Sequence, residues 1–355
     1  DPEDKGIKEE WFKDNTFDDI IILPGSTITN KKGFKPDINT RWTGSIYDSS
    51  WYYDPAMEKY RLEAKFPFWL TPETYYVGPA WYVKNIRLNK KIFYRYILFL
   101  ERPHIITKLW INNSYVGQQT SLSTPHCYDI TDYLNNGNNT ISIMIDNRIN
   151  EINVGPDSHS ITDHTQGNWN GIAGKIGIKI LPNIYIENIK IVPDIENKKI
   201  KTIYYIKNFS NSEQNCKLKT YVNSINNKQK FKSVKYLIKI MPGDNIIEKE
   251  YQMNNNAKYW DEFNPFLYKL NAIIKYKKLK HVYNEYFGLR KIETFDRQFL
   301  INKKPVFLRG TVECAAHPLT GYPPCDINYW YKIFQKCKDY GLNHVRFHSW
   351  CPPEE

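Results

Sequence analysis

Polar and aromatic side chains that commonly bind ligands gather at the end of the sequence, in the stretch GLNHVRFHSWCPPEE. Arg346 and His348 end a short apolar run, and Trp350 follows it. Arginine and histidine can donate hydrogen bonds to hydroxyl or carboxylate oxygens, and tryptophan stacks on flat apolar surfaces. We therefore predict that these three side chains line a binding pocket. The structural alternatives are a satisfied core histidine, a buried arginine paired with an acid, and a tryptophan lid over a helix.

Two further groups of residues have the same chemical character. Arg309 and Glu313 lie at the end of the apolar run VFLRGTV, and the polar loop GPDSHSITDHTQGNWNGIAG contains Asp163, His164 and Trp169. A carboxylate can accept two hydrogen bonds from neighbouring hydroxyl groups, so we predict that this loop and both acids contact a hydroxylated ligand. An Arg309–Glu313 ion pair and an Asx turn at Asp163 are the structural alternatives.

The elements that must position these residues alternate between strand and helix. We expect a strand at 306–312, a helix at 326–341 and a second strand at 343–348. Asp326 can cap the helix and Gly341 can end it. The residues that we expect on one apolar face of the helix are Ile327, Trp330, Tyr331, Phe334 and Cys337. A strand, a crossover helix and a strand form a βαβ unit with parallel strands. Two parallel strands cannot form a stable sheet alone, so we expect the chain to be the front of a longer α/β barrel or sheet.

The rest of the sequence is predicted to be β-structure. At 1–185, short apolar and aromatic runs alternate with turn signals such as Asn112-Asn113, a pattern typical of a jelly-roll-like antiparallel sandwich. A second series of runs at 186–290 fits an immunoglobulin-like sandwich, which we interpret as a spacer. Residues 291–355 hold the βαβ unit. The predicted fold class is multidomain β plus α/β.

Composition excludes several other classes of protein. The net charge is +11, but the lysines are scattered among Ile, Asn and Tyr instead of forming a stripe, so we predict no nucleic-acid partner. No apolar run is long enough to span a membrane. The six cysteines include no Cys-x-x-Cys pair, which favours free, buried thiols over a zinc site or a disulfide framework. Aromatic residues make up 15% of the chain, which suits β-sheets and surfaces that stack on sugar rings.

A series of segments resembles, in order, glycoside hydrolase family 2, to which the β-galactosidases and β-glucuronidases belong. For the sugar-binding domain the segments are ILPGST, YYVGPAWYVKNI, LWINNSYVGQQ, YDITDYLNNGNNTISIMIDN and WNGIAGKIGI. For the end of the immunoglobulin-like domain they are WDEFNPFLYKL and YFGLRKIE, and for the start of the barrel FLINKKPVFLRGTVECAAHPLTG. The resemblance covers nearly the whole chain and implies that the βαβ unit opens a (β/α)8 barrel.

The resemblance implies a retaining exo-β-glycosidase that acts on β-linked glycans. Such an enzyme needs two carboxyl groups about 5–5.5 Å apart. In the family these are glutamates on later barrel strands, so we expect them beyond residue 355 and expect the chain alone to be inactive. Glu354 and Glu355 are instead expected in the first turn of a following helix. The mechanism requires no cofactor, and no metal ligands are predicted.

A non-catalytic carbohydrate-binding or adhesion protein is the alternative, and the βαβ unit argues against it. The expected partner is a β-linked oligosaccharide or polysaccharide, with a homo-oligomer left open. The acidic, polar start DPEDKGIKEEW is no signal peptide; if one has been removed, a periplasmic or secreted location is favoured.

Overall fold

We describe the chain from a computed structural model. The structure describes residues 1–14, 16–37, 40–44, 54–61, 72–149, 154–155, 157–163, 165, 167–317 and 319–355. These residues form two compact units, which are treated separately below. Unit 1 comprises Asp1–Lys91, Tyr96–Lys179 and Arg309–Glu355, and unit 2 comprises Ile92–Arg95 and Ile180–Leu308. None of the helices in the described ranges is long and apolar enough to cross a membrane.

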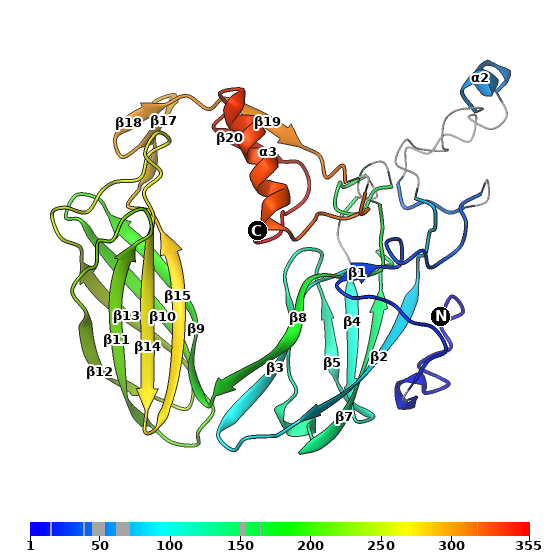
Figure 1. Cartoon of the computed structure of the whole chain (residues 1–355), viewed down its shortest axis with the longest axis horizontal. Helices are drawn as coiled ribbons and strands as arrows, with labels where there is room; N and C mark the ends of the chain where they lie inside the picture. Colours follow the sequence, from blue (N-terminus) through cyan, green and yellow to red (C-terminus); the bar gives the residue numbers. More distant parts are fainter. Residues whose placement is uncertain are drawn as a thin grey trace. The chain divides into compact units, whose positions relative to one another are not determined.

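Most of unit 1 is a β-sandwich of two four-stranded sheets (Figure 1). One sheet has the order β1-β8-β3-β6, with the strands β1 Gly25–Ser26, β8 Gly171–Pro182, β3 Tyr94–Pro103 and β6 His126–Asp129. The other has the order β2-β7-β4-β5, with the strands β2 Pro79–Leu88, β7 Gly137–Asp146, β4 Ile106–Ile111 and β5 Ser114–Thr120. The pairs β1–β8, β3–β6, β2–β7, β4–β7 and β4–β5 are all antiparallel. Short helical segments are η1 Trp11–Lys13, η2 Pro55–Met57, α2 Glu58–Arg61 and η3 Thr131–Tyr133.

Turn chemistry and apolar strands explain this sandwich. Asn112 and Asn113 join β4 to β5 with φ values of 49° and 69°, a left-handed conformation that asparagine tolerates better than most residues, and the predicted turn is confirmed. The strands carry fully buried Leu100, Leu109 and Ile145. The two sheets are also linked by hydrogen bonds between the Thr107 hydroxyl on β4 and both the His126 ring and the Tyr128 hydroxyl on β6, each 2.6 Å long.

The predicted βαβ unit is confirmed within unit 1. β19 (Gly310–Glu313) and β20 (His344–Phe347) pair in parallel, and α3 (Ile327–Asp339) connects them. The Asp326 side chain caps α3 by accepting a 3.0 Å hydrogen bond from Asn328 N. Gly341 follows the helix with φ +72°, a backbone conformation that glycine adopts without steric cost.

Two details of this unit differ from the prediction. The expected strand at 306–312 is two strands, because β18 (Lys304–Val306) pairs in the opposite direction with β17 (Gln298–Ile301) before β19 begins. The expected apolar face of α3 is only partly buried. Trp330 is 2% exposed, whereas Ile327 and Tyr331 are 66% and 67% exposed. The hydrophobic periodicity therefore predicted the helix correctly but not the contacts of every residue on its apolar face.

Unit 2 contains a second antiparallel sandwich, made of a three-stranded and a four-stranded sheet, and a separate small sheet that follows it in the sequence. The three-stranded sheet of the sandwich has the order β13-β10-β9, with the strands β13 Gly243–Gln252, β10 Lys199–Asn208 and β9 Ile184–Asp194. Its four-stranded sheet has the order β12-β11-β14-β15, with the strands β12 Val234–Ile240, β11 Gln214–Ser224, β14 Tyr268–Tyr276 and β15 Leu279–Phe287. The small sheet joins β16 (Ile292–Phe295), β17 and β18. Seven strands divided three and four fit the immunoglobulin-like prediction.

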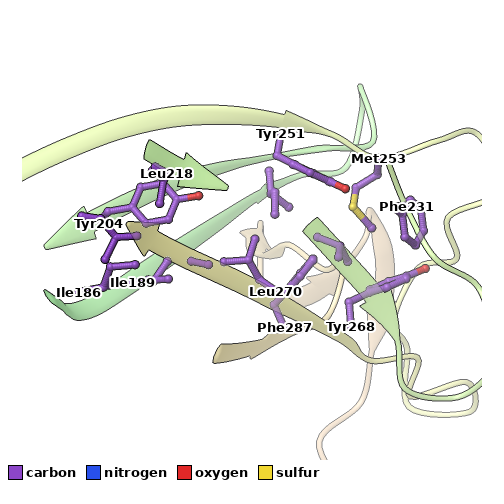
Figure 2. Packing of buried hydrophobic residues seen from close by; sticks show 14 of the residues in the cluster. Ile186, Ile189, Tyr204, Leu218, Phe231, Tyr251, Met253, Tyr268, Leu270 and Phe287 are labelled. Atoms are coloured by element: carbon purple, nitrogen blue, oxygen red, sulfur yellow. The ribbon is translucent and has the colours of Figure 1, made fainter. Parts of the chain in front are cut away.

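The interior of unit 2 is one apolar cluster (Figure 2). Residues alternate between buried and less buried positions along β11, as a half-buried strand requires. Tyr204, Tyr268 and Leu270 are 0% exposed, and the Tyr204 hydroxyl bonds to Thr220 Oγ1 across the sandwich at 2.8 Å. The six cysteines are free, as predicted, but the expectation that they are buried is confirmed only for Cys216, since Cys127 and Cys351 are exposed and the other three are half-buried.

Candidate functional site

The carboxyl ends of β19 and β20 lie side by side. The strands pair in register from Gly310 with His344 to Glu313 with Phe347. One further hydrogen bond, from His348 N to Glu313 O at 2.9 Å, extends the pairing beyond the strands. Ligand sites in sheets with parallel strands lie at this edge, because loops and side chains converge there. The predicted residues Glu313 and His348 are therefore neighbours at an edge suited to binding.

A loop of the sandwich meets this edge next to His348. The His159 and His348 rings lie with their centroids 4.6 Å apart. Ser158 Oγ and Ser160 Oγ donate hydrogen bonds of 3.0 and 2.7 Å to the carbonyl oxygen of Ser349. Ser349 Oγ lies 3.0 Å from His348 Nδ1. We call these five residues, Ser158, His159, Ser160, His348 and Ser349, the strand-end cluster. It places two imidazoles and several hydroxyls where they can exchange hydrogen bonds with a ligand.

A buried arginine holds the segment that follows the cluster. Arg102, on β3 and 8% exposed, donates from Nη1 to Cys351 O at 2.7 Å and from Nη2 to Pro352 O at 2.8 Å. Burial holds the pKa of its guanidinium below the usual value. Hydrogen bonds from a charged donor are stronger than neutral ones, so this contact fixes the backbone just after Trp350. Sequence reasoning missed Arg102, because nothing in FLERPH separates it from an ordinary strand residue.

Trp350 packs as a lid over α3. Its side chain is 8% exposed and belongs to a small core with Ala315 and Trp330. The indole Nε1 donates a 3.2 Å hydrogen bond to Glu313 O, which ties the end of β19 to the residue that follows the cluster. This packing agrees with the structural alternative for Trp350, a lid over a helix. A contact between Trp350 and substrate stays a prediction.

Glu313 and Arg309 lie at opposite ends of β19, which corrects the prediction that both end the first strand. Arg309 precedes the strand and donates from Nε to Gly341 O at 2.8 Å, whereas Glu313 ends it. Four residues of extended chain span roughly 13 Å, so these two side chains are not placed as an ion pair. Glu313 Oε2 accepts from Ala315 N at 2.9 Å, and burial raises the pKa of its carboxyl.

Arg346 is exposed on β20, and we find no hydrogen bond or ion pair from it to any described residue. In this chain Arg346 is thus not buried, and the alternative of an arginine paired with an acid on a further barrel strand stays a prediction. An exposed guanidinium two residues before His348 is available to a ligand at this edge, and its contact with substrate remains a prediction.

Asp163 and Trp169 lie inside unit 1. Asp163 is 4% exposed, and its Oδ2 accepts hydrogen bonds from Thr43 N and, at 3.1 Å, from Gly44 N. Burial raises the pKa of Asp163 to about 6. Trp169 is 1% exposed, and its ring stacks on His104 with centroids 4.5 Å apart. In this conformation both residues brace the loop from within. Predicted substrate contact by either would require the loop to open. His164 lies outside the described residues.

The space beside this edge is small and partly open. A cavity of about 10 Å³ lies among Arg102, His104, Trp169 and Trp350, with Leu122, Ser123, Ser160, Pro323 and Cys351 completing its wall. That volume is about the minimum needed for one water molecule. Burial lowers the pKa of His104 to about 3, so this ring is neutral. A sugar would therefore have to bind outside this cavity, on the open side of the strand-end cluster.

The acids near this edge do not form an open carboxyl pair with one another. Glu355 pairs with Lys175 at 3.2 Å and its side chain is 14% exposed, while Glu354 is 85% exposed and 4.0 Å from the same lysine. Glu101 is 5% exposed. The Glu101 and Glu355 carboxyls do approach one another, but both side chains are largely buried and Glu355 is paired with Lys175. Among the residues that the structure describes, this edge can therefore hold a hydroxylated ligand but offers no exposed carboxyl pair of the kind that a retaining glycosidase uses.

Comparisons with known proteins match this architecture along most of the chain. The model described as "Glycosyl hydrolases family 2, sugar binding domain" matches residues 45–182, and the model "Glycosyl hydrolases family 2" matches residues 184–290. A β-galactosidase of Thermoanaerobacter pseudethanolicus is 25% identical over 296 residues, which cover 79% of this chain and 38% of that protein. A β-galactosidase of Oenococcus oeni is 25% identical over 225 residues, or 60% of this chain and 21% of that protein.

Solved structures share the fold. The structure of Bacteroides uniformis β-glucuronidase has a TM-score of 0.71 at 20% identity, covering 97% of this chain and 38% of that one. A GH2 β-galacturonidase from Eisenbergiella tayi has a TM-score of 0.62 at 17% identity, covering 79% of this chain and 47% of that one. The chain thus spans less than half the length of these relatives. Two family models that follow one another along the sequence, with relatives and folds that agree, show that the chain belongs to glycosyl hydrolases family 2.

Proposed function

We propose that this chain supplies the substrate-binding front of a retaining exo-β-glycosidase that removes a terminal sugar from β-linked glycans. Membership of glycosyl hydrolases family 2 supports the reaction class. The observation that carries the proposal is the strand-end cluster, because it joins a sandwich loop to the carboxyl edge of two parallel strands. We propose that β19, α3 and β20 are the first βαβ unit of a (β/α)8 barrel, in which this edge faces the site.

The role proposed for the chain is to bind the sugar, with the cleavage chemistry supplied elsewhere. His348 is half-buried at the strand end, with Nδ1 near Ser349 Oγ, and is our first candidate for a contact with a sugar hydroxyl. The exposed Arg346 is the second candidate. The acid/base and the nucleophile are expected on later barrel strands, outside the 355 residues. By itself the chain is therefore expected to hydrolyse no glycoside.

The nature of the sugar follows only from the relatives. The two curated relatives described above are named β-galactosidases, and the two solved neighbours are titled β-glucuronidase and β-galacturonidase. We propose a β-galactosidase-like specificity, with a uronic acid as the second choice. An exposed arginine at the pocket edge would suit the carboxylate of a uronic acid, so the charge at position 346 bears on this choice.

The test compares the full-length product of the gene with the 355-residue chain. Both are incubated with p-nitrophenyl β-galactoside and β-glucuronide, and the first-formed anomer is recorded by NMR. We expect turnover with retention of configuration from the full-length protein and none from the 355-residue chain. Release of the inverted anomer would contradict the mechanism. Tight glycan binding without any turnover would favour the adhesion alternative.

A control addresses the position of the catalytic pair. Should the 355-residue chain itself turn over substrate, Glu354→Gln and Glu355→Gln are made in it. Loss of activity in either variant would overturn the placement of both carboxyls on later strands.

A further inference from the structure

Three side chains from distant segments of unit 1, none of them a member of the strand-end cluster, meet at one point. Glu101 lies on β3, Cys325 precedes α3, and Glu355 follows β20. One carboxylate oxygen of each glutamate and the Cys325 sulfur all lie within 4.8 Å of one another. No motif could reveal this group, because its members are far apart in the sequence. We call it the Glu–Cys–Glu cluster.

The hydrogen bonding of the cluster is incomplete. Glu101 is 5% exposed; its Oε2 accepts from Lys175 N at 2.6 Å, but its buried Oε1 has no partner among the described residues. Glu355 repeats the pattern, since Oε1 pairs with Lys175 Nζ at 3.2 Å while Oε2 is buried and likewise lacks a described partner. Buried carboxylate oxygens without a partner are costly, and native structures normally satisfy them with a donor, a water molecule or a cation.

The surrounding chain is shaped to hold Glu101 in this place. Gly174 has φ +74°, and a Cβ on it would lie 2.5 Å from the Glu101 carboxyl carbon. A glycine there allows the carboxyl to approach the backbone, and Lys175 N then fixes one of its oxygens. The orientation of Glu101 is thus determined by its neighbours and does not depend on a bound ligand.

Cys325 gives the cluster its chemical preference. Burial, together with the nearby Glu101 carboxylate, raises the pKa of its thiol to about 12, so the thiol is neutral in the absence of a cation. A divalent metal ion releases the thiol proton and binds the thiolate. Calcium and magnesium take oxygen ligands, whereas zinc accepts sulfur and carboxylate oxygen together.

We propose that Glu101, Cys325 and Glu355 bind one zinc-class divalent cation, with water as the fourth ligand. Two carboxylates and a thiolate supply three negative charges, which the cation and the ammonium of Lys175 balance. The ion would join β3 of the sandwich to the segments on either side of α3 and β20, so its role is structural. The proposal does not depend on the proposed glycosidase function.

The test uses the metal-free, chemically reduced 355-residue chain. Zn²⁺ alone is titrated by calorimetry, and Co²⁺ is titrated while the near-ultraviolet thiolate-to-cobalt absorption band is recorded. We expect one equivalent of either metal, the absorption band, and a higher melting temperature with Zn²⁺ that a chelator reverses.

Matched variants assign the ligands. Cys325→Ser should abolish the cobalt absorption band. Cys325→Ser and Glu355→Gln should each weaken zinc binding more than about 100-fold, because the loss of a residue that only supports a metal ligand already costs about 10–100-fold. Cys337→Ser and Glu354→Gln are the controls and should leave both signals unchanged. Circular dichroism verifies that each variant folds. If Cys325→Ser does not fold, the zinc affinity of Glu355→Gln, a change close to the surface, decides whether the site exists.

Two results would overturn the proposal. A folded chain that binds neither metal would mean that the two carboxyls share a proton instead. Zinc binding that survives Cys325→Ser but is lost in His348→Ala would place the ion at the His159–His348 pair. No glycosidase activity is measured, so failure here leaves the proposed function untouched, and failure of the proposed function leaves this site untouched.

Discussion

The two sandwiches have similar architectures but different interiors. Unit 2 buries one continuous apolar cluster, and the polar side chains inside it are few and uncharged (Figure 2). Unit 1 also buries charged side chains, imidazoles and a larger set of amides, namely Glu101, Arg102, His104, His126, Asn139, Asp146, Asn147, Asp163, Asn168, Asn170 and His317. A spacer needs only an apolar core to be stable. An interior that must hold loops in fixed places needs directional bonds.

The amides of unit 1 show what these bonds do. Asn147 Nδ2 donates to Tyr76 O and Asn168 O, and Asn170 Nδ2 donates to Gly78 O and Ile145 O, all at 2.9–3.0 Å. Each amide thus links backbone segments that are far apart in sequence. Unit 2 also holds a buried amide of this kind, since Asn208 Nδ2 donates to Ile240 O at 3.1 Å, but among the described residues buried charged side chains occur only in unit 1. Because buried charge is costly unless it is satisfied, we infer that unit 1 is the sandwich that positions a site.

The largest effect is expected in the apolar interior. Leu270→Ala in β14 removes a side chain that is 0% exposed, and should lower the free energy of unfolding of unit 2 by about 4 kcal/mol. Chemical denaturation, monitored through the hydrogen exchange of peptides from unit 2, measures this change in the free energy of unfolding. Leu237→Ala, at an 82% exposed position on β12, is the control and should change little. Equal effects in both variants would mean that the apolar core does not stabilise unit 2 as described.

In the polar interior, Arg102→Met tests the directional bonds. Loss of both charged hydrogen bonds to Cys351 O and Pro352 O should cost about 3 kcal/mol. Hydrogen exchange should increase at 349–355 and stay unchanged in unit 2. Arg87→Met, on an exposed position of β2, is the control. Unchanged exchange at 349–355 would show that Arg102 does not hold that segment.

The pH dependence of unit 1 should reveal Asp163. Its pKa in the folded state is about 6, above the ordinary value of 3.8, because of burial. The folded protein therefore holds this proton more tightly than the unfolded chain, and the contribution of Asp163 to stability falls as the pH rises from about 4 to about 6. The total change is up to about 3 kcal/mol. Denaturation of the parent chain and of Asp163→Asn at pH 4 and pH 7 measures it. Parallel stability curves would refute the assignment.

At the strand-end cluster, the expected effect is kinetic. In the full-length protein, His348→Ala should lower kcat and kcat/KM together by roughly 10²-fold, or about 2.7 kcal/mol, because a bond to the sugar tightens in the transition state. The fold should survive. His344→Ala, an exposed histidine on β20, is the control. A lower melting temperature with unchanged kinetics would identify His348 as a structural residue.

The smallest effect is expected where the sandwich loop meets the strand end. Ser160→Ala removes the 2.7 Å hydrogen bond to Ser349 O and should lower the stability of unit 1 by about 1 kcal/mol. Since Ser158 also donates to that oxygen, the double variant should cost more than either single variant. Thermal unfolding of the three variants provides the measurement. A double variant no less stable than Ser160→Ala would show that Ser158 contributes nothing.

Local patterns predicted the fold well where one element determines the outcome. The Asp326 cap, the Asn112-Asn113 turn and the parallel strands on either side of α3 were all predicted, because each depends on neighbouring residues or on a connection of limited length. The predicted strand at 306–312 is only partly confirmed, since β19 covers its end whereas Val306 belongs to β18, which pairs with β17. Which partner a strand chooses is a tertiary property that its own sequence does not specify.

The site was less predictable for the same reason. His348 could be singled out because it directly follows a strand, but the partners of Asp163 lie in the segment around residue 43, far from the turn that its own sequence suggested. Arg102 and Glu101 occur in an ordinary strand run and carry no local signal. Their roles depend on contacts with residues beyond position 320, which only the folded chain brings together.

The Arg102 clamp also affects the timing of synthesis. Its acceptor at Cys351 lies 249 residues further along the chain. A ribosome adds roughly 5–20 residues per second, so roughly 12–50 s pass between the synthesis of the donor and that of its acceptor. During this interval the strands of the sandwich are already made, while the guanidinium has no carbonyl to bind and remains hydrated. The final assembly of unit 1 therefore waits until the segment around residue 351 has been synthesised, and conditions that slow elongation prolong the time for which its interior is open to water and to chaperones.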